Sequence, residues 1–85
     1  MEKQVTVQIE AGLEARPIAM LVQIASKFNS TVYLESDGRK VNAKSIMGMM
    51  SLALKTGDSI NIIAEGDDEK EAVDGVEKYL ANKTN

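Results

Sequence analysis

The sequence contains no cysteine, no histidine and no tryptophan among its 85 residues. Without cysteine, the chain can form no disulfide, carries no thiol nucleophile and offers no thiolate ligand for a metal. Without histidine, it has no imidazole to act as a general base, to bind zinc or to accept a phosphoryl group. Glycine-rich phosphate loops, paired carboxylates in a clear cleft and metal-ligand spacings are also lacking. We therefore expect a protein without catalytic residues, bound metal or cofactor.

Long apolar segments and an excess of positive charge are missing as well. The longest apolar run covers residues 18–22, which is far too short to span a membrane. The first residues lack the apolar stretch of a secretory signal, so we expect a cytoplasmic protein that makes no contact with membranes. Ten basic and thirteen acidic side chains give a net charge of −3, which disfavours direct binding to nucleic acid.

The hydropathy pattern predicts a single small α+β domain over residues 1–85. Hydrophobic residues make up 44% and charged residues 27% of the chain, as is usual for a globular domain of this length. Apolar and polar residues alternate, as in half-buried strands, over residues 3–9, 32–35, 40–43 and 60–63. Helical spacing of apolar residues predicts helices over residues 17–29, 46–50 and 69–80. The order β-α-β-β-α-β-α predicts an open-faced sandwich, with helices on one face of the sheet.

Individual residues mark the ends of several elements. Asp37 and Gly38 predict a type I′ hairpin turn, since both central positions of that turn need a positive φ. Ser45 precedes the short second helix and is expected to cap its N-terminus. Asp68 and Glu71 have the spacing of an N-cap and a capping-box acid, so we expect Asp68 to cap the last helix.

The short helix is expected to expose part of its apolar surface. Met49 and Leu52 suit its buried side, whereas Ile46, Met47 and Met50 fall at i, i+1 and i+4, which leaves some of them facing outward. Methionine suits adaptable partner surfaces, and an exposed apolar patch beside a serine favours a binding site. The alternative is that all three side chains belong to the core.

Two segments resemble the HPr family, the phosphocarriers of the bacterial sugar phosphotransferase system. Residues 12–17 read Gly-Leu-Glu-Ala-Arg-Pro, similar to the active-site segment Gly-(Ile/Leu)-His-Ala-Arg-Pro of that family. Residues 44–52 read Lys-Ser-Ile-Met-Gly-Met-Met-Ser-Leu, similar to the regulatory-serine segment of HPr proteins from low-GC Gram-positive bacteria. The resemblance covers essentially the whole chain. It implies four antiparallel strands with three helices on one face, in agreement with the order of elements above.

The resemblance implies a function through two residues. Glu14 stands where the family carries its phosphorylated histidine, which implies that the chain is not a phosphohistidine carrier. Ser45 stands where HPr kinase/phosphorylase adds a phosphate, which implies a regulatory phosphoprotein of carbon catabolite repression. The phosphorylated form is then expected to act as corepressor for the LacI-family catabolite control protein. Family members dock their partners through positions that correspond here to Arg16, Ala19, Met20, Gln23, Ile46, Met47 and Met50.

Several alternatives stay open at this point. Ser45 can be a plain helix cap, and Glu14 can be either a solvated carboxylate or a permanent charge that replaces phosphohistidine, with Arg16 as its anion partner. A phosphocarrier that uses the Glu14 carboxylate and an enzyme of unknown type are the competing functions. We also expect a monomer that can form a strand-swapped homodimer, because exchange of the first strand preserves every hydrogen bond of the sheet.

Overall fold

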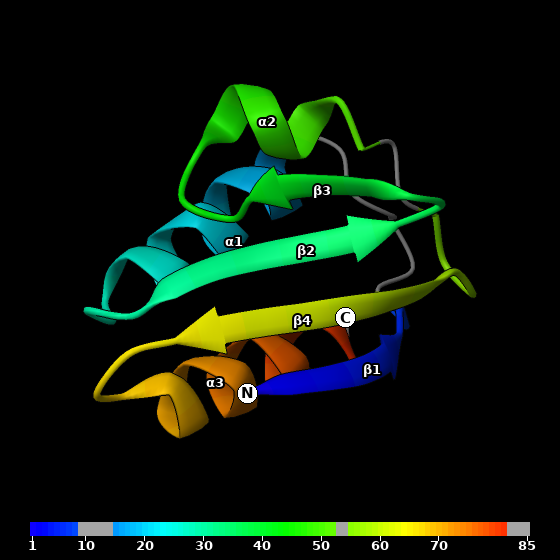
Figure 1. The fold of residues 1–85 in the computed structure, drawn as a ribbon. Helices are drawn as coiled ribbons and strands as arrows, with labels where there is room; N and C mark the ends of the chain where they lie inside the picture. Colours follow the sequence, from blue (N-terminus) through cyan, green and yellow to red (C-terminus); the bar gives the residue numbers. More distant parts are fainter. Residues whose placement is uncertain (9–14, 53–54, 82–85) are drawn as a thin grey trace.

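The computed structural model describes residues 1–8, 15–52 and 55–81. In these residues, four strands and three helices follow one another in the predicted order (Figure 1). The elements are β1 (Glu2–Thr6), α1 (Ala15–Ser26), β2 (Thr31–Ser36), β3 (Arg39–Asn42), α2 (Ile46–Met50), β4 (Ser59–Glu65) and α3 (Glu69–Leu80).

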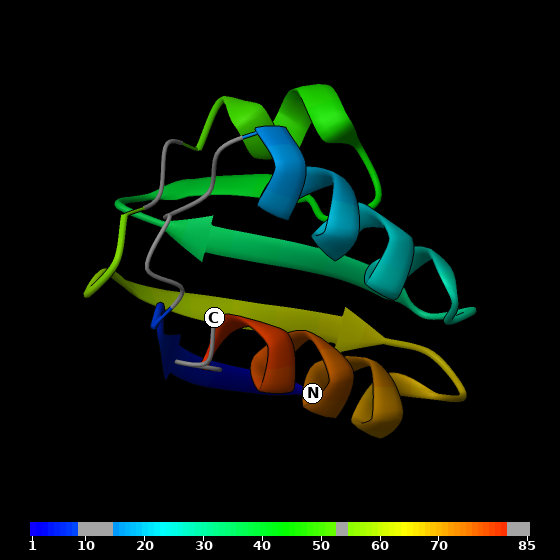
Figure 2. The same ribbon diagram turned by 180° about the vertical axis from the view of Figure 1, so that it is seen from behind.

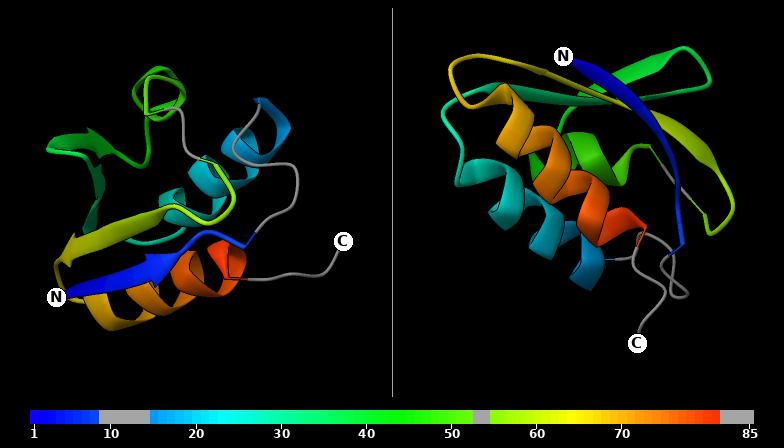
Figure 3. Two further views of the ribbon diagram at one scale, coloured as in Figure 1. Left: turned by 90° about the vertical axis from the view of Figure 1, so that its right-hand side faces the viewer. Right: turned by 90° about the horizontal axis from the view of Figure 1, so that it is seen from below.

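All strand pairs in the sheet are antiparallel, and the strand order is β1-β4-β2-β3. The type I′ turn predicted between β2 and β3 is confirmed, because Asp37 and Gly38 have φ values of 52° and 78°. The three helices lie on one face of the sheet, and no helix of the described residues lies on the other face (Figures 2 and 3). The predicted α+β open-faced sandwich is therefore correct.

The core lies between the sheet and the helices because the strands alternate as expected. Alternate residues are buried in both central strands, Val32 and Leu34 in β2 and Ile60, Ile62 and Ala64 in β4, and the other residues of these strands are exposed or only partly covered. The largest fully buried hydrophobic side chains come from all three helices, from β2 and β4, and from the segment after β1: Val7, Leu21, Val32, Leu34, Met49, Ile60, Ile62, Val73, Val76 and Leu80.

The predicted ends of the first strand and of the first helix are wrong. The first strand ends at Thr6, because the next residue, Val7, bonds to the loop before β4: its N–H donates to Asp58 O at 2.8 Å, and its carbonyl accepts from Gly57 N at 2.7 Å. Ile9, the predicted end, lies outside the described residues. The first helix ends at Ser26 and not at Asn29, since the backbone N–H of Asn29 donates to the Asp68 carboxylate at 2.9 Å.

Asp68 is the N-cap residue of α3, as predicted, but its side chain does not cap the helix as expected. Asp68 makes no side-chain capping bond to α3. Its carboxylate instead accepts hydrogen bonds from the backbone N–H groups of Asn29 and Ser30, both at 2.9 Å, and from the Ser30 hydroxyl. At the same helix end, Glu69 Oε1 accepts from Gly66 N at 3.2 Å. Asp68 therefore joins the start of α3 to the start of β2, a long-range role that local spacing does not reveal.

Candidate phosphorylation and docking site

Ser45 caps the N-terminus of α2, as predicted. Its backbone is extended, with φ −113° and ψ 118°, and its Oγ accepts a hydrogen bond from Gly48 N at 3.2 Å. Its own N–H donates to Asn42 O at 3.0 Å, and its carbonyl accepts from Met49 N at 2.9 Å. The hydroxyl is therefore held over the first turn of α2 while the residue stays partly exposed.

The turn that leads into Ser45 is fixed by two bonds of Lys44. Its backbone N–H donates to Asn42 Oδ1 at 2.8 Å. Its ammonium donates to Phe28 O at 2.8 Å, just beyond the end of α1. The side chain that precedes the serine thus ties the start of α2 to α1, and Ser45 sits on a well-anchored segment.

The side chains that follow Ser45 form an exposed apolar surface, which we call the α2 patch: Ile46, Met47 and Met50. Their exposed fractions are 48%, 83% and 54%. Met49 of the same helix and Leu52, which follows it, are instead buried in the core. The prediction that some of these side chains face outward is confirmed, since all three do, and the alternative that all three are core residues is wrong.

The predicted docking residues of α1 lie on the helix that packs beside α2 (Figure 2). Met20 is 45% exposed, Gln23 is exposed, and Ala19 is half-buried. Arg16 belongs to α1, but its side chain lies outside the described part of the chain, and Glu14 lies outside the described residues altogether. The structure therefore brings Ser45 and the α2 patch together on a short helix next to α1, and leaves the Glu14 prediction untested.

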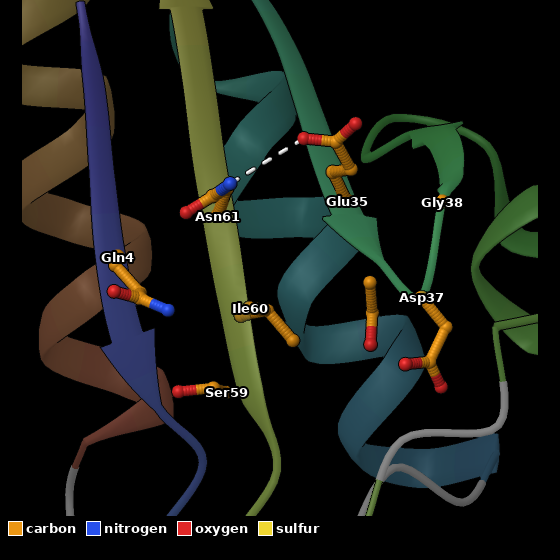
Figure 4. Close-up of a pocket in the computed structure, with 8 residues that line it drawn as sticks. Gln4, Glu35, Asp37, Gly38, Ser59, Ile60 and Asn61 are labelled. Atoms are coloured by element: carbon orange, nitrogen blue, oxygen red, sulfur yellow. Dashed lines mark hydrogen bonds between the residues drawn. The ribbon is translucent and has the colours of Figure 1, made fainter.

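A concave region lies on the open face of the sheet, away from the helices (Figure 4). It has a volume of about 260 Å³ and is lined by Gln4, Glu35, Ser36, Asp37, Gly38, Ser59, Ile60 and Asn61. Asn61 Nδ2 donates to Glu35 Oε1 at 3.4 Å across it. The hollow forms because β2 and β4 pair only as far as Glu35 and Asn61, whereas β1 follows β4 to Ser59. Sequence patterns did not predict it, and none of the predicted site residues lines it.

In the described ranges, no three or more acidic side chains are grouped so that they could hold a metal ion. None of the helices in those ranges is long and apolar enough to cross a membrane.

Residues 1–82 match the sequence model of the family described as the PTS HPr component phosphorylation site, so the chain belongs to the HPr family. It is 51% identical over 80 residues to the HPr-like protein Crh of Halalkalibacterium halodurans, across 94% of this chain and 95% of that protein. The identity to Crh of Bacillus subtilis is also 51% over 80 residues, across 94% of each chain.

Solved structures of both kinds of family member share the fold. The phosphocarrier protein HPr of Bacillus anthracis superposes with a TM-score of 0.92 at 48% identity, over 94% of this chain and 95% of that one. A crystal structure of Crh from Bacillus subtilis, described as a dimer with a swapping domain, gives a TM-score of 0.77 at 52% identity, over 92% of this chain and 90% of that one. The chain is thus similar both to a phosphocarrier and to a protein described as the catabolite repression HPr.

Proposed function

We propose that this chain is a non-enzymatic regulatory phosphoprotein of carbon catabolite repression. HPr kinase/phosphorylase phosphorylates Ser45, and the phosphorylated form is a corepressor of the LacI-family catabolite control protein. One observation carries the proposal: Ser45 caps α2 directly beside the exposed side chains of Ile46, Met47 and Met50. The 51% identity to Crh supports it. The proposal places the protein in the cytoplasm, where the kinase finds its ATP.

A phosphate on Ser45 changes the chemistry of this surface in one step. It adds about −1.5 to −2 charges at neutral pH and three strong acceptor oxygens. The Ser45 Oγ already accepts from Gly48 N, so the phosphoryl oxygens remain close to backbone donors of the first turn. A partner with a basic pocket beside an apolar groove then gains a charge-assisted contact that the unmodified chain does not offer. The methionines of the α2 patch suit such a groove because thioether side chains adapt their shape.

Phosphorylation is tested by incubating the protein with purified HPr kinase and ATP, followed by intact-mass analysis and peptide mapping. We expect one added phosphate, about 80 Da, on Ser45. Ser45→Ala should abolish it. Ser45→Asn is the matched control for folding, because asparagine keeps a capping acceptor but has no hydroxyl to phosphorylate. A phosphate on another residue, or none on the folded wild-type chain, contradicts the proposal.

Corepressor activity is tested by titrating the catabolite control protein with both forms. The affinity should rise at least about tenfold on phosphorylation, since a hydrogen bond to a charged group contributes about 1.5–3 kcal/mol. Met47→Asp should weaken binding of the phosphorylated form. Gln4→Asp makes the same charge change on the open sheet face and should leave binding unchanged. Equal affinity for the two forms refutes the corepressor role and leaves Ser45 as a helix cap.

A phosphocarrier is the second candidate function, because residues 12–17 keep the pattern of the family's active-site segment apart from Glu14. A carboxylate can form only an acyl phosphate, and the chain has no histidine to replace it. We expect no mass change with enzyme I and phosphoenolpyruvate, whereas Glu14→His should create phosphate acceptance. An adduct on Glu14 of the wild-type chain would establish the carrier instead.

The proposed assembly is a monomer that can form a strand-swapped homodimer. β1 is an edge strand that pairs with β4, and the Bacillus subtilis Crh structure is described as a dimer with a swapping domain.

A further inference from the structure

The sulfur atoms of this protein are all thioethers, and most of them are exposed. The chain has five methionines and no cysteine. Met49 is fully buried, whereas Met1, Met20, Met47 and Met50 are exposed. Two of the exposed methionines, Met47 and Met50, lie in the α2 patch, and Met47 is the most exposed large hydrophobic residue described.

We infer that Met47 and Met50 are an oxidation-sensitive modification site that controls docking at the α2 patch. This inference rests on the proposed function for its regulatory consequence, but the chemistry of the site does not depend on the partner. The oxidant is a hydroperoxide. Susceptibility of a methionine follows exposure of its sulfur, and the product, methionine sulfoxide, is polar.

The reaction is a two-electron oxygen transfer. A lone pair of the thioether sulfur attacks one oxygen of hydrogen peroxide, the S–O bond forms and the O–O bond breaks. The proton of the transferred oxygen passes to the departing hydroxide, so that sulfur is oxidised and the peroxide is reduced to water. Methionine sulfoxide reductase reverses the change: two thiols become a disulfide, and the oxygen leaves as water.

Oxidation at this site should act on docking and leave the phosphorylation site intact. The bonds that hold Ser45 come from the backbone of Gly48, Asn42 and Met49, and none involves a methionine side chain. By contrast, the α2 patch presents only the side chains of Ile46, Met47 and Met50. Two sulfoxides there replace apolar contact area with polar groups that a partner's apolar groove cannot hydrogen-bond.

The buried Met49 provides an internal standard on the same short helix. In the folded protein it has no exposed surface, so a small oxidant reaches it only after local opening. A difference in oxidation rate between Met49 and the exposed methionines of the same helix therefore reports exposure, because these residues share sequence context and chemistry. Unfolding in urea removes this difference.

The first experiment treats the folded, full-length protein with hydrogen peroxide and maps sulfoxides by peptide mass, at about 16 Da each. Met47 and Met50 should oxidise at least about tenfold faster than Met49. In urea, the three rates should become similar. Oxidation of Met49 as fast as Met47 in the folded protein would overturn the site assignment.

The second experiment measures docking after oxidation. The Ser45-phosphorylated protein, before and after peroxide, is titrated with the catabolite control protein, and oxidation should lower the affinity at least about tenfold. Treatment with both sulfoxide reductases, one for each sulfoxide epimer, and dithiothreitol should restore it. The double variant Met47→Leu, Met50→Leu is titrated before and after peroxide in the same way. Its affinity should fall much less than that of the wild type, relative to its own value before treatment. Kinase and ATP should still phosphorylate the oxidised wild type.

The outcomes of this experiment distinguish the corepressor role from the oxidation switch. If the untreated phosphorylated protein does not bind, the corepressor role is refuted and the regulatory consequence falls with it. If the untreated protein binds and the oxidised protein binds equally well, only the oxidation switch is refuted. A loss in the leucine variant as large as in the wild type also refutes it, because the effect then arises elsewhere in the chain.

Discussion

The Asp68 carboxylate joins two parts of the chain that are far apart in sequence. Its pKa lies below the ordinary value of 3.8, first because of the hydrogen bond from the Ser30 hydroxyl and then because of those from the backbone N–H groups of Asn29 and Ser30. Desolvation opposes this shift. The ionised carboxylate is therefore favoured in the folded state over the unfolded state.

Acid should weaken this link in a predictable direction. Because the pKa of Asp68 is lower in the folded protein, its contribution to the free energy of unfolding is complete above the ordinary value of 3.8 and is lost as the pH falls through the lower, folded-state value. Asp68→Asn should be less stable than wild type at neutral pH, and the difference should shrink on acidification.

The measurement is urea unfolding of both proteins over a series of acidic pH values. Asp67→Asn is the matched control, since it makes the same change of charge at the exposed neighbouring residue. Parallel stability curves for the wild type and Asp68→Asn would show that the carboxylate bonds do not stabilise the fold.

The same residue shows what local sequence patterns cannot reveal. The spacing of Asp68 and Glu71 fits a capping box, but the carboxylate of Asp68 is used by Asn29 and Ser30. An aspartate can serve either as a helix cap or as an acceptor for a remote segment, so spacing alone does not decide between the two roles. At Ser45 the local reading was correct, because the acceptor's partner is Gly48, three residues away.

The contact between α1 and α3 depends on a residue without a side chain. A Cβ added at Gly75 would lie 3.2 Å from Cζ of Phe28, which follows α1, and 3.7 Å from Cγ2 of Ile24 in α1. Both are partly buried side chains packed against the core. Gly75 thus allows close packing at the cost of helix propensity, which is about 1 kcal/mol relative to alanine.

Substitution at Gly75 should separate these two effects. Gly75→Ala should raise the free energy of unfolding by up to about 1 kcal/mol, because the atom it meets is the far end of a half-buried ring that can shift. Gly75→Val should lower it by about 1–3 kcal/mol through overpacking. In a Phe28→Leu background, Gly75→Ala should stabilise more than in wild type, a coupling that a double-mutant cycle in urea measures. No coupling would mean that the ring does not limit the space.

Elements were easier to predict than their ends. Period-two and helical spacing identified all the described strands and helices, because burial on one face imposes those periods on the sequence. The ends of β1 and α1 were wrong because hydrogen bonds to remote groups, Asp58 O for Val7 and the Asp68 carboxylate for Asn29, stop the pattern. The α2 patch was predicted from spacing, whereas the hollow on the open face depends on where β2 diverges from β4.

At the scale of the whole molecule, β1 is bound to the rest of the fold by hydrogen bonds and an ion pair that a second copy of the chain can also supply. β1 pairs with β4 from Glu2 opposite Ile63 to Thr6 opposite Ser59. The Met1 ammonium donates to Ala64 O at 2.7 Å, and Lys3 forms an ion pair with Glu77 of α3 at 2.9 Å. Exchange of β1 between two copies would remake each of these contacts, so monomer and dimer should differ little in enthalpy and the balance should follow concentration.

Two introduced cysteines can report which chain supplies β1. Gln4 and Asn61 are opposite each other in the β1–β4 ladder, and both side chains lie on the open face (Figure 4). Directly opposite Cβ atoms in a sheet are about 4.5–5.5 Å apart, close to the span of about 3.5–4.5 Å in a disulfide. Because the native chain has no cysteine, Gln4→Cys with Asn61→Cys introduces the only two thiols.

Size-exclusion chromatography of this variant at high concentration should give two slowly interconverting peaks. After oxidation of each peak and denaturation without reductant, the small species should retain the mass of one chain. The large species should have the mass of two chains, because each disulfide then joins β1 of one copy to β4 of the other. A large species that denatures to single chains with internal disulfides would be a dimer formed through another surface. A single monomer peak after weeks at high concentration would refute exchange of β1. Once β1 is released from β4, its docking onto a second copy should take minutes at most.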